Sequence, residues 1–241
     1  MIAVHLSLAF LGSFGDAINF VVHGQEAKTG GVHVGGPHKM LELALTQLKV
    51  TALAMGLALA IALPTGVLLG HYGRGELLAV GAGNLGRALP ELAIIAIGAF
   101  TIGVGLLTVT IALAILAIPP ILTNAYIAIR GVDRGVVDAA RGMGMTETEQ
   151  ILKVELPLAV PTLMSGIRLS TINVVATATI APIAGVLTLG DLIISKGVNG
   201  TAGEIAAGIC VALLALALEG LLALVQRLLT PAGVRTAPAA R

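Results

Sequence analysis

Residues 138–157 read DAARGMGMTETEQILKVELP, and they are rich in charge within a chain that has little. The 241 residues include only 14 Lys and Arg and 13 Asp and Glu. Nine of these charged residues fall between positions 130 and 155, and long apolar runs lie on both sides. We therefore expect a solvated segment between membrane helices, which meets a partner in water.

The overall composition excludes a water-soluble globular domain. Hydrophobic residues make up 56 % of the chain and charged residues 11 %, and the mean hydropathy is +0.99. Backbone polar groups in lipid must pair internally, which leaves helices or closed barrels, and the apolar runs lack the alternation of barrel strands. The sequence predicts an all-α, polytopic membrane protein in a lipid bilayer. Six aromatic residues and no basic run give no reason to expect nucleic-acid binding.

Five segments have the roughly 20 apolar residues that a helix needs to cross a bilayer. They are 50–70, 88–105, 108–129, 163–187 and 205–225. A further apolar run within 2–22 predicts a sixth, peripheral helix, either spanning or interfacial. The expected organisation is an N-terminal hydrophobic segment with an external loop (1–40), a transmembrane domain (41–230) and a tail (231–241).

The positions of Lys and Arg predict the orientation, because cytoplasmic loops are enriched in both residues. Arg130, Arg141 and Arg168 follow the third apolar segment, so we expect 131–157 to be cytoplasmic. Arg227 and the arginines after it predict a cytoplasmic C-terminus as well.

Motifs for catalysis or metal binding are lacking. The three histidines within 23–40 have a spacing that matches no tight metal site. The single cysteine, Cys210, excludes a disulfide framework. Neither H-E-x-x-H, G-x-S-x-G nor G-x-x-x-x-G-K-[ST] occurs. We therefore expect no catalytic residue, no metal and no cofactor on this chain.

The charged stretch begins with a short predicted helix. Residues 132–143 favour a helix, with small Ala139 and Ala140 that would let another protein approach its backbone closely. Gly142 and Gly144 are expected to end the helix, because glycine readily adopts positive φ.

A second helix is predicted directly after this turn. Thr146 and Glu149 have the S/T-x-x-E spacing of a capping box, which opens a helix. Pro157 is expected to end it, because the residue before a proline disfavours the α region. Two capped helices suit docking on a partner better than they suit an ordinary loop, which is about four to six residues long.

The same stretch resembles the cytoplasmic signature of ATP-binding-cassette importer permeases, E-A-A-x3-G-x9-I-x-L-P. The matching positions are Asp138, Ala139, Ala140, Gly144, Val154, Leu156 and Pro157. Asp replaces Glu and Val replaces Ile, while the spacing is intact. Residues 62–75, 116–145 and 154–168 further resemble the osmoprotectant branch, which imports glycine betaine, choline and carnitine.

This resemblance implies a five-helix importer-type permease core in the cytoplasmic (inner) membrane. The matching positions would couple to a separate ATPase subunit that carries ATP and Mg. The other implied partners are a second permease, identical or different, and an external solute-binding protein. A permease for methionine or another small amino compound is the alternative within this class. A multipass membrane enzyme and a membrane anchor for a signalling complex are the alternatives outside it.

Small polar residues on the third and fourth apolar segments are candidates for lining the solute pathway. They are Thr123, Asn124, Ser170, Thr171, Asn173, Thr177 and Thr179. The alternative is that their side chains bond across helices and only hold the bundle together.

Overall fold

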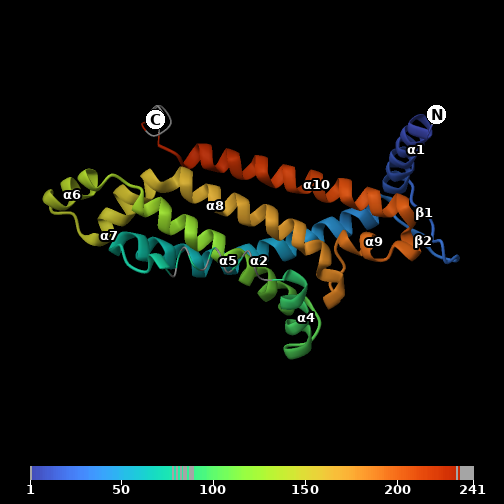
Figure 1. Cartoon of the computed structure of the whole chain (residues 1–241), viewed down its shortest axis with the longest axis horizontal. Coiled ribbons are helices and arrows are strands. Elements are labelled where there is room, and N and C mark those ends of the chain that lie inside the picture. The colour runs from blue at the N-terminus through green and yellow to red at the C-terminus, as the bar shows by residue number, and fades with distance from the viewer. Residues whose placement is uncertain are drawn as a thin grey trace. The chain divides into compact units, whose positions relative to one another are not determined.

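The protein is helical almost throughout in a computed structural model of the whole chain (Figure 1). The structure describes residues 2–77, 79, 81, 83, 86, 90–231 and 233, with side chains from residue 12 onward. Within this part, strands are limited to the antiparallel pair β1 (Gln25–Glu26) and β2 (His33–Val34). The all-α prediction is confirmed. Apart from Pro231 and Gly233, the predicted tail 231–241 lies outside the described residues.

Four described helices are long and apolar enough to cross a membrane. They are α2 (Gly36–Tyr72), α5 (Leu106–Arg130), the continuous helical stretch Glu147–Ala184, and α10 (Lys196–Leu229). Each contains or overlaps one of the predicted spans, so the polytopic architecture is confirmed.

The span predicted over 88–105 forms a shorter helix, α4 (Glu91–Thr101). Its 11 residues give a length of about 16 Å at 1.5 Å per residue, whereas the hydrocarbon core is about 30 Å thick. Pro90 precedes α4, and Gly103 and Gly105 follow it with φ of 101° and 138°, values that a helix does not use. The apolar composition of this segment therefore overestimates the length of its helix.

The chain forms two compact units, and the first comprises Met1–Leu53, Glu91–Leu113 and Val174–Ala217. The helix predicted within 2–22 is present as α1 (Ile2–Val22). Its Phe20 packs in a buried cluster with residues of α2, of α9 (Gly190–Ile194) and of α10.

An irregular segment follows α8 (Leu156–Thr177) in the first unit. It begins with a 3₁₀ helix, η2 (Ala178–Ala184). Gln47 is fully buried; its Nε2 donates to the carbonyl of Val175 at 2.9 Å, and its Oε1 accepts from the amide of Leu189 at 3.2 Å. Irregular backbone is tolerated in a membrane protein where it is buried and hydrogen-bonded, and Gln47 provides such bonds here.

The second unit comprises Ala54–Pro90, Ala114–Asn173 and Leu218–Arg241. In it, α2 packs closely on α5 through Gly66 and Gly70, which form a G-x-x-x-G pair. A methyl group added at Gly66 would lie 2.6 Å from the Cβ of Ala125, and one at Gly70 would lie 2.9 Å from the Cβ of Ile129. The end of α2 is therefore held against α5 at close range.

Candidate functional site

The segment between α5 and α8 begins with the predicted short helix, which is present as α6 (Arg134–Gly142). Asp133 caps it, since its Oδ1 accepts a hydrogen bond from the amide of Gly135 at 2.8 Å. Within this helix, the side chains of Val137 and Ala140 are buried, while Asp138 is exposed. The helix is thus fixed to the protein on one face and open on the other.

The turn after α6 depends on Gly144, which has a φ of +83°. Its amide donates to the carbonyl of Arg141 at 3.0 Å, and the amide of Met145 donates to the carbonyl of Ala140 at 3.2 Å. These two bonds form a Schellman motif, whose pivotal residue is usually glycine. The predicted role of Gly144 is confirmed. Gly142, in contrast, is the last residue of the helix and does not break it.

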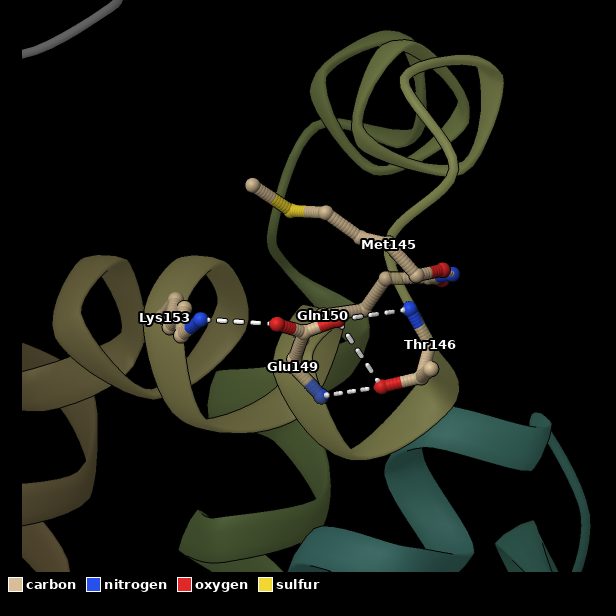
Figure 2. Close-up of polar contacts among 5 residues, drawn as sticks. All are labelled: Met145, Thr146, Glu149, Gln150 and Lys153. Atoms are coloured by element: carbon tan, nitrogen blue, oxygen red, sulfur yellow. Dashed lines mark hydrogen bonds and ion pairs between the residues drawn. The ribbon is translucent and has the colours of Figure 1, made fainter.

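The predicted capping box is confirmed at the start of α7 (Glu147–Glu149). The amide of Thr146 donates to Oε2 of Glu149 at 3.1 Å, and the amide of Glu149 donates back to Oγ1 of Thr146 at 3.4 Å. Gln150 adds a bond from its Nε2 to the carbonyl of Met145 at 2.9 Å (Figure 2). The box and the glutamine together fix the direction in which the chain leaves the turn.

Glu149 also pairs with Lys153 one helical turn on, at 2.7 Å between Oε1 and Nζ (Figure 2). Glu149 lies in the charged stretch that precedes the apolar part of the helix. There the bond from Lys153, followed by the bonds from Thr146, lowers its pKa to about 2. The stability that the ionised Glu149 contributes to the folded protein is fully present above its ordinary pKa of 4.5, and it is lost as pH falls through about 2. The capping box is therefore intact throughout the physiological pH range.

Replacing Thr146 with alanine is expected to loosen the start of α7. Loss of a threonine N-cap costs about 1 kcal/mol, so amide hydrogens of 149–153 should exchange about fivefold faster. Hydrogen exchange of the purified protein measures this effect. Thr148→Ala is the matched control, because Thr148 is exposed and lies outside the box. Equal exchange in the two variants would contradict the role of the box.

Pro157 does not end the second helix, contrary to the prediction. The helix continues from Glu147 to Ala184, first through the π-helical η1 (Gln150–Glu155) and then through α8. A proline inside a helix lacks an amide donor and clashes with the carbonyl four residues earlier. The amide of Leu156 donates to the carbonyl of Ile151, five residues back, so the wider π turn directly precedes the proline and accommodates it.

A buried ionic cluster at the end of η1 was not foreseen from the sequence. Glu155 is fully buried, although its position in a charged stretch indicated a solvated residue. Its Oε2 lies 2.6 Å from Nδ1 of His71, on the last turn of α2, and the His71 side chain is 4 % exposed. Its Oε1 lies 3.7 Å from Nη1 of Arg134 at the start of α6.

The predicted coupling positions divide into three groups by exposure. Asp138, Ala139 and Gly144 are exposed, Val154, Leu156 and Pro157 are partly buried, and Ala140 is buried at 2 % exposure. Ala139 is therefore open to a partner, whereas Ala140 packs inside this chain. Met143, at 73 % exposure, and Leu152, at 59 %, add apolar surface beside them.

Most of the candidate pathway residues bond within their own chain. Ser170 donates to the carbonyl of Ala117 at 3.3 Å, and Thr177 donates to Oε2 of Glu91 at 2.9 Å. Thr123, Asn124, Thr171 and Thr179 donate to backbone carbonyls. The bonds of Thr123, Ser170 and Thr177 cross between segments, as expected of residues that hold helices together. The other three bonds reach only three or four residues back along the same helix. Asn173 differs from them because its side chain is exposed.

Arg168 lies within α8, not in the charged segment with which it was grouped. Its Nε donates to Oε1 of Glu219 on α10 at 2.9 Å, its Nη2 contacts the same oxygen, and its Nη1 donates to Oε1 of Gln226 at 2.7 Å. Ionised residues within apolar helices are costly and usually pair with one another. This pair joins α8 to α10 inside the second unit.

The described side chains include no group of three or more His, Cys, Asp or Glu that could hold a metal ion. The distinctive feature is instead the folded, capped segment 131–155 between two long apolar helices. Together they define a multi-pass membrane protein with a structured polar segment between two of its long helices.

Comparison with known proteins identifies the family. Residues 45–231 match the family described as binding-protein-dependent transport system inner membrane component. The chain belongs to this family of transport permeases.

Similar proteins are permeases of osmoprotectant transport systems. The choline transport system permease protein OpuBB of Bacillus subtilis (strain 168) is 39 % identical over 77 % of this chain and 86 % of its own length. The carnitine transport permease protein OpuCB of Listeria monocytogenes is 38 % identical over 83 % of this chain and 92 % of its own length. The predicted resemblance to the osmoprotectant branch is confirmed.

Solved structures share the fold. A chain of the MetNI methionine ABC transporter in an inward-facing conformation has a TM-score of 0.69 and 22 % identity, over 79 % of this chain and 96 % of that one. A chain of an amino acid ABC transporter crystallised with histidines has a TM-score of 0.60. At this identity the likeness concerns the architecture, which is that of ABC importer permeases.

Proposed function

We propose that this chain is the transmembrane permease subunit of an ATP-driven importer for small osmoprotectants, such as glycine betaine, choline or carnitine. The observation that carries this proposal is the similarity to permeases named for choline and carnitine transport, at 38–39 % identity over more than three quarters of the chain. The 22 % likeness to a methionine transporter supports the fold and not a substrate.

The proposed mechanism places the segment 131–157 in the cytoplasm, docked on a separate ATPase subunit that binds ATP and Mg. The exposed face formed by Asp138, Ala139 and Met143 suits a groove on that subunit. When the ATPases close, the docked segment moves as a rigid body and the core helices switch access between the two sides of the membrane. The unbroken helix Glu147–Ala184 supports this mechanism, because it continues from the segment into the apolar core.

Two further partners complete the proposed transporter. A second permease, identical or different, would form the other half of the pathway. An external solute-binding protein would select the solute, because quaternary ammonium groups are usually held in cages of several aromatic rings. This chain has no Trp, two Tyr and four Phe, which supports placing such a cage on another protein.

Uptake of radiolabelled glycine betaine into vesicles tests the proposal. The vesicles contain the complete complex, which is this permease with its ATPase, its partner permease and its binding protein, and ATP is supplied on the ATPase side. We expect ATP-dependent uptake that unlabelled choline or carnitine reduces and methionine does not.

The competitors separate the proposed function from its alternatives. If methionine alone abolished uptake, the transporter class would stand and the substrate would be a small amino compound. If the complex hydrolysed ATP yet moved none of the four solutes when each was radiolabelled in turn, the osmoprotectant assignment would be wrong.

A further inference from the structure

The carboxylate of Glu155 is unusual because it is buried within a segment whose other charges are mostly exposed. Its side chain has no exposed surface. A buried carboxylate is costly unless it is paired and hydrogen-bonded. Its partners come from two other elements, His71 on α2 and Arg134 on α6. The carboxylate is therefore the point at which α2, α6 and η1 meet.

The contact with His71 links the segment to a helix that the chain does not connect to it. Covalently, the segment 131–155 continues only from α5 and into α8. The bond between His71 and Glu155 spans 84 residues of sequence, and its length of 2.6 Å is that of a strong polar bond. On its other side, the end of α2 is held against α5 by Gly66 and Gly70.

The second oxygen of Glu155, Oε1, faces Arg134 on α6. Nη2 of Arg134 and Oε1 of Glu155 are both buried, and neither has a hydrogen-bond partner among the described residues. The nearest guanidinium nitrogen lies 3.7 Å from Oε1, roughly 0.5 Å beyond the usual range of an N–H···O hydrogen bond. At this range the attraction still links α6 to Glu155, and a small shift of α6 toward η1 would complete the bond.

We propose that Glu155 and His71 are positioning residues that make α2 a third helix driven by the docked segment, together with α5 and α8. Movement of α6 and α7 on the ATPase would pull on the end of α2 through this buried polar contact, which adds a directional bond to the apolar cluster that Val67 of α2 shares with Val137 of α6. The inference rests on the proposed function, because it assigns these residues a part in coupling ATP hydrolysis to transport.

Replacing His71 with leucine tests the contact. The leucine fills a similar space and cannot hydrogen-bond to Glu155. We expect the complex to assemble and to hydrolyse ATP, while solute moved per ATP hydrolysed falls at least about tenfold, which corresponds to the loss of one hydrogen bond to a charged group. Uptake and phosphate release, measured on the same vesicles, give this ratio.

Two matched variants separate positioning from packing. In His71→Asn, the side-chain amide can donate from near the position of Nδ1, so we expect a ratio within about threefold of the unmodified complex. Tyr72→Phe removes the 3.0 Å bond from the neighbouring tyrosine to Glu147, which is exposed, and should leave the ratio unchanged. Equal ratios in the leucine and asparagine variants would overturn the proposal.

Hydrogen exchange on the unmodified complex gives a readout that needs neither a variant nor a transported solute. When the ATPase binds a non-hydrolysable ATP analogue, exchange in residues 69–73 should change together with exchange in 147–155. If exchange changed in 147–155 alone, the proposed link through His71 and Glu155 would be overturned, even if the leucine variant fails to fold. If both regions changed in a complex that imports no osmoprotectant, the result would support the link between α2 and the segment and would contradict the substrate assignment.

Discussion

Replacing Gly144 with tryptophan will reduce ATP-dependent uptake to background while leaving insertion into the membrane intact. Gly144 has a φ of +83°, at which a residue with a side chain is strained by about 1–2 kcal/mol. A Cβ at this position meets nothing within 4 Å in its own chain. The indole would therefore extend outward, over the surface that we propose docks on the ATPase.

Two measurements test this expectation: ATP-dependent uptake of solute, and the amount of ATPase that co-purifies with the permease. We expect the variant to be recovered from membranes in normal amounts, to lose most of its bound ATPase and to import no solute. Normal transport by Gly144→Trp would contradict docking at this turn.

Gly144→Asn is the matched control, because asparagine tolerates positive φ better than other residues with side chains. Its small side chain would extend into the same open space without covering the neighbouring surface. We expect uptake within about threefold of the unmodified complex, since asparagine is an accepted residue at this position of the motif. If asparagine were as damaging as tryptophan, backbone strain and not steric exclusion would explain the loss.

The turn after α6 and the start of α7 were predictable from the sequence, because they depend on neighbouring residues. The capping box joins Thr146 to Glu149, and the Schellman bonds reach back from Gly144 and Met145 by three and five residues. Local chemistry of this kind does not need the rest of the fold. The same holds for the long helices, because a run of about 20 apolar residues has few alternatives in lipid.

Features that depend on distant residues, or on backbone geometry that a local signal does not determine, were not predictable. The burial of Glu155 requires His71, which lies on another helix, and nothing in a charged stretch distinguishes a buried acid from exposed ones. Pro157 has the usual signal for a helix end, yet the π turn before it lets the helix continue. The shortness of α4 reflects the glycines after it, although composition alone favours a full span.

The candidate pathway residues show that residue type alone does not determine the role of a polar side chain in an apolar helix. A hydroxyl can line a path or bond to a neighbouring helix, and the sequence is the same in both cases. Ser170 and Thr123 bond to carbonyls of other segments, whereas the exposed Asn173 keeps its place as a candidate for contact with solute or with a second permease.

Replacing Glu219 with alanine is the change expected to destabilise the protein most. The guanidinium of Arg168 would lose the carboxylate that its Nε and Nη2 contact. Breaking a buried ion pair from one side costs about 3–5 kcal/mol, because the other charge remains unpaired. Arg168 and Glu219 are 29 % and 27 % exposed, so the pair is only partly buried and the expected loss is smaller, about 2–3 kcal/mol.

Thermal unfolding of the detergent-purified permease measures this loss. A change of this size should lower Tm by roughly 5–10 °C for a chain of this length. Glu204→Ala is the matched control, since Glu204 pairs with Lys196 at the start of α10 and their side chains are 36 % and 57 % exposed. An exposed pair contributes about 0–1 kcal/mol, so the control should unfold close to the unmodified protein.

The double variant Arg168→Leu and Glu219→Leu distinguishes charge compensation from a need for these polar groups. Removing both charges leaves no ion to be stabilised inside the apolar helices, and apolar replacement of a buried pair is often neutral or stabilising. We expect Tm to return to within a few degrees of the unmodified value, even though Gln226 loses its bond from Nη1 of Arg168. If the double variant were as unstable as Glu219→Ala, the pair would not be a self-contained charge balance. Its side chains would then have to hold α8 and α10 together by bonds that leucine cannot replace.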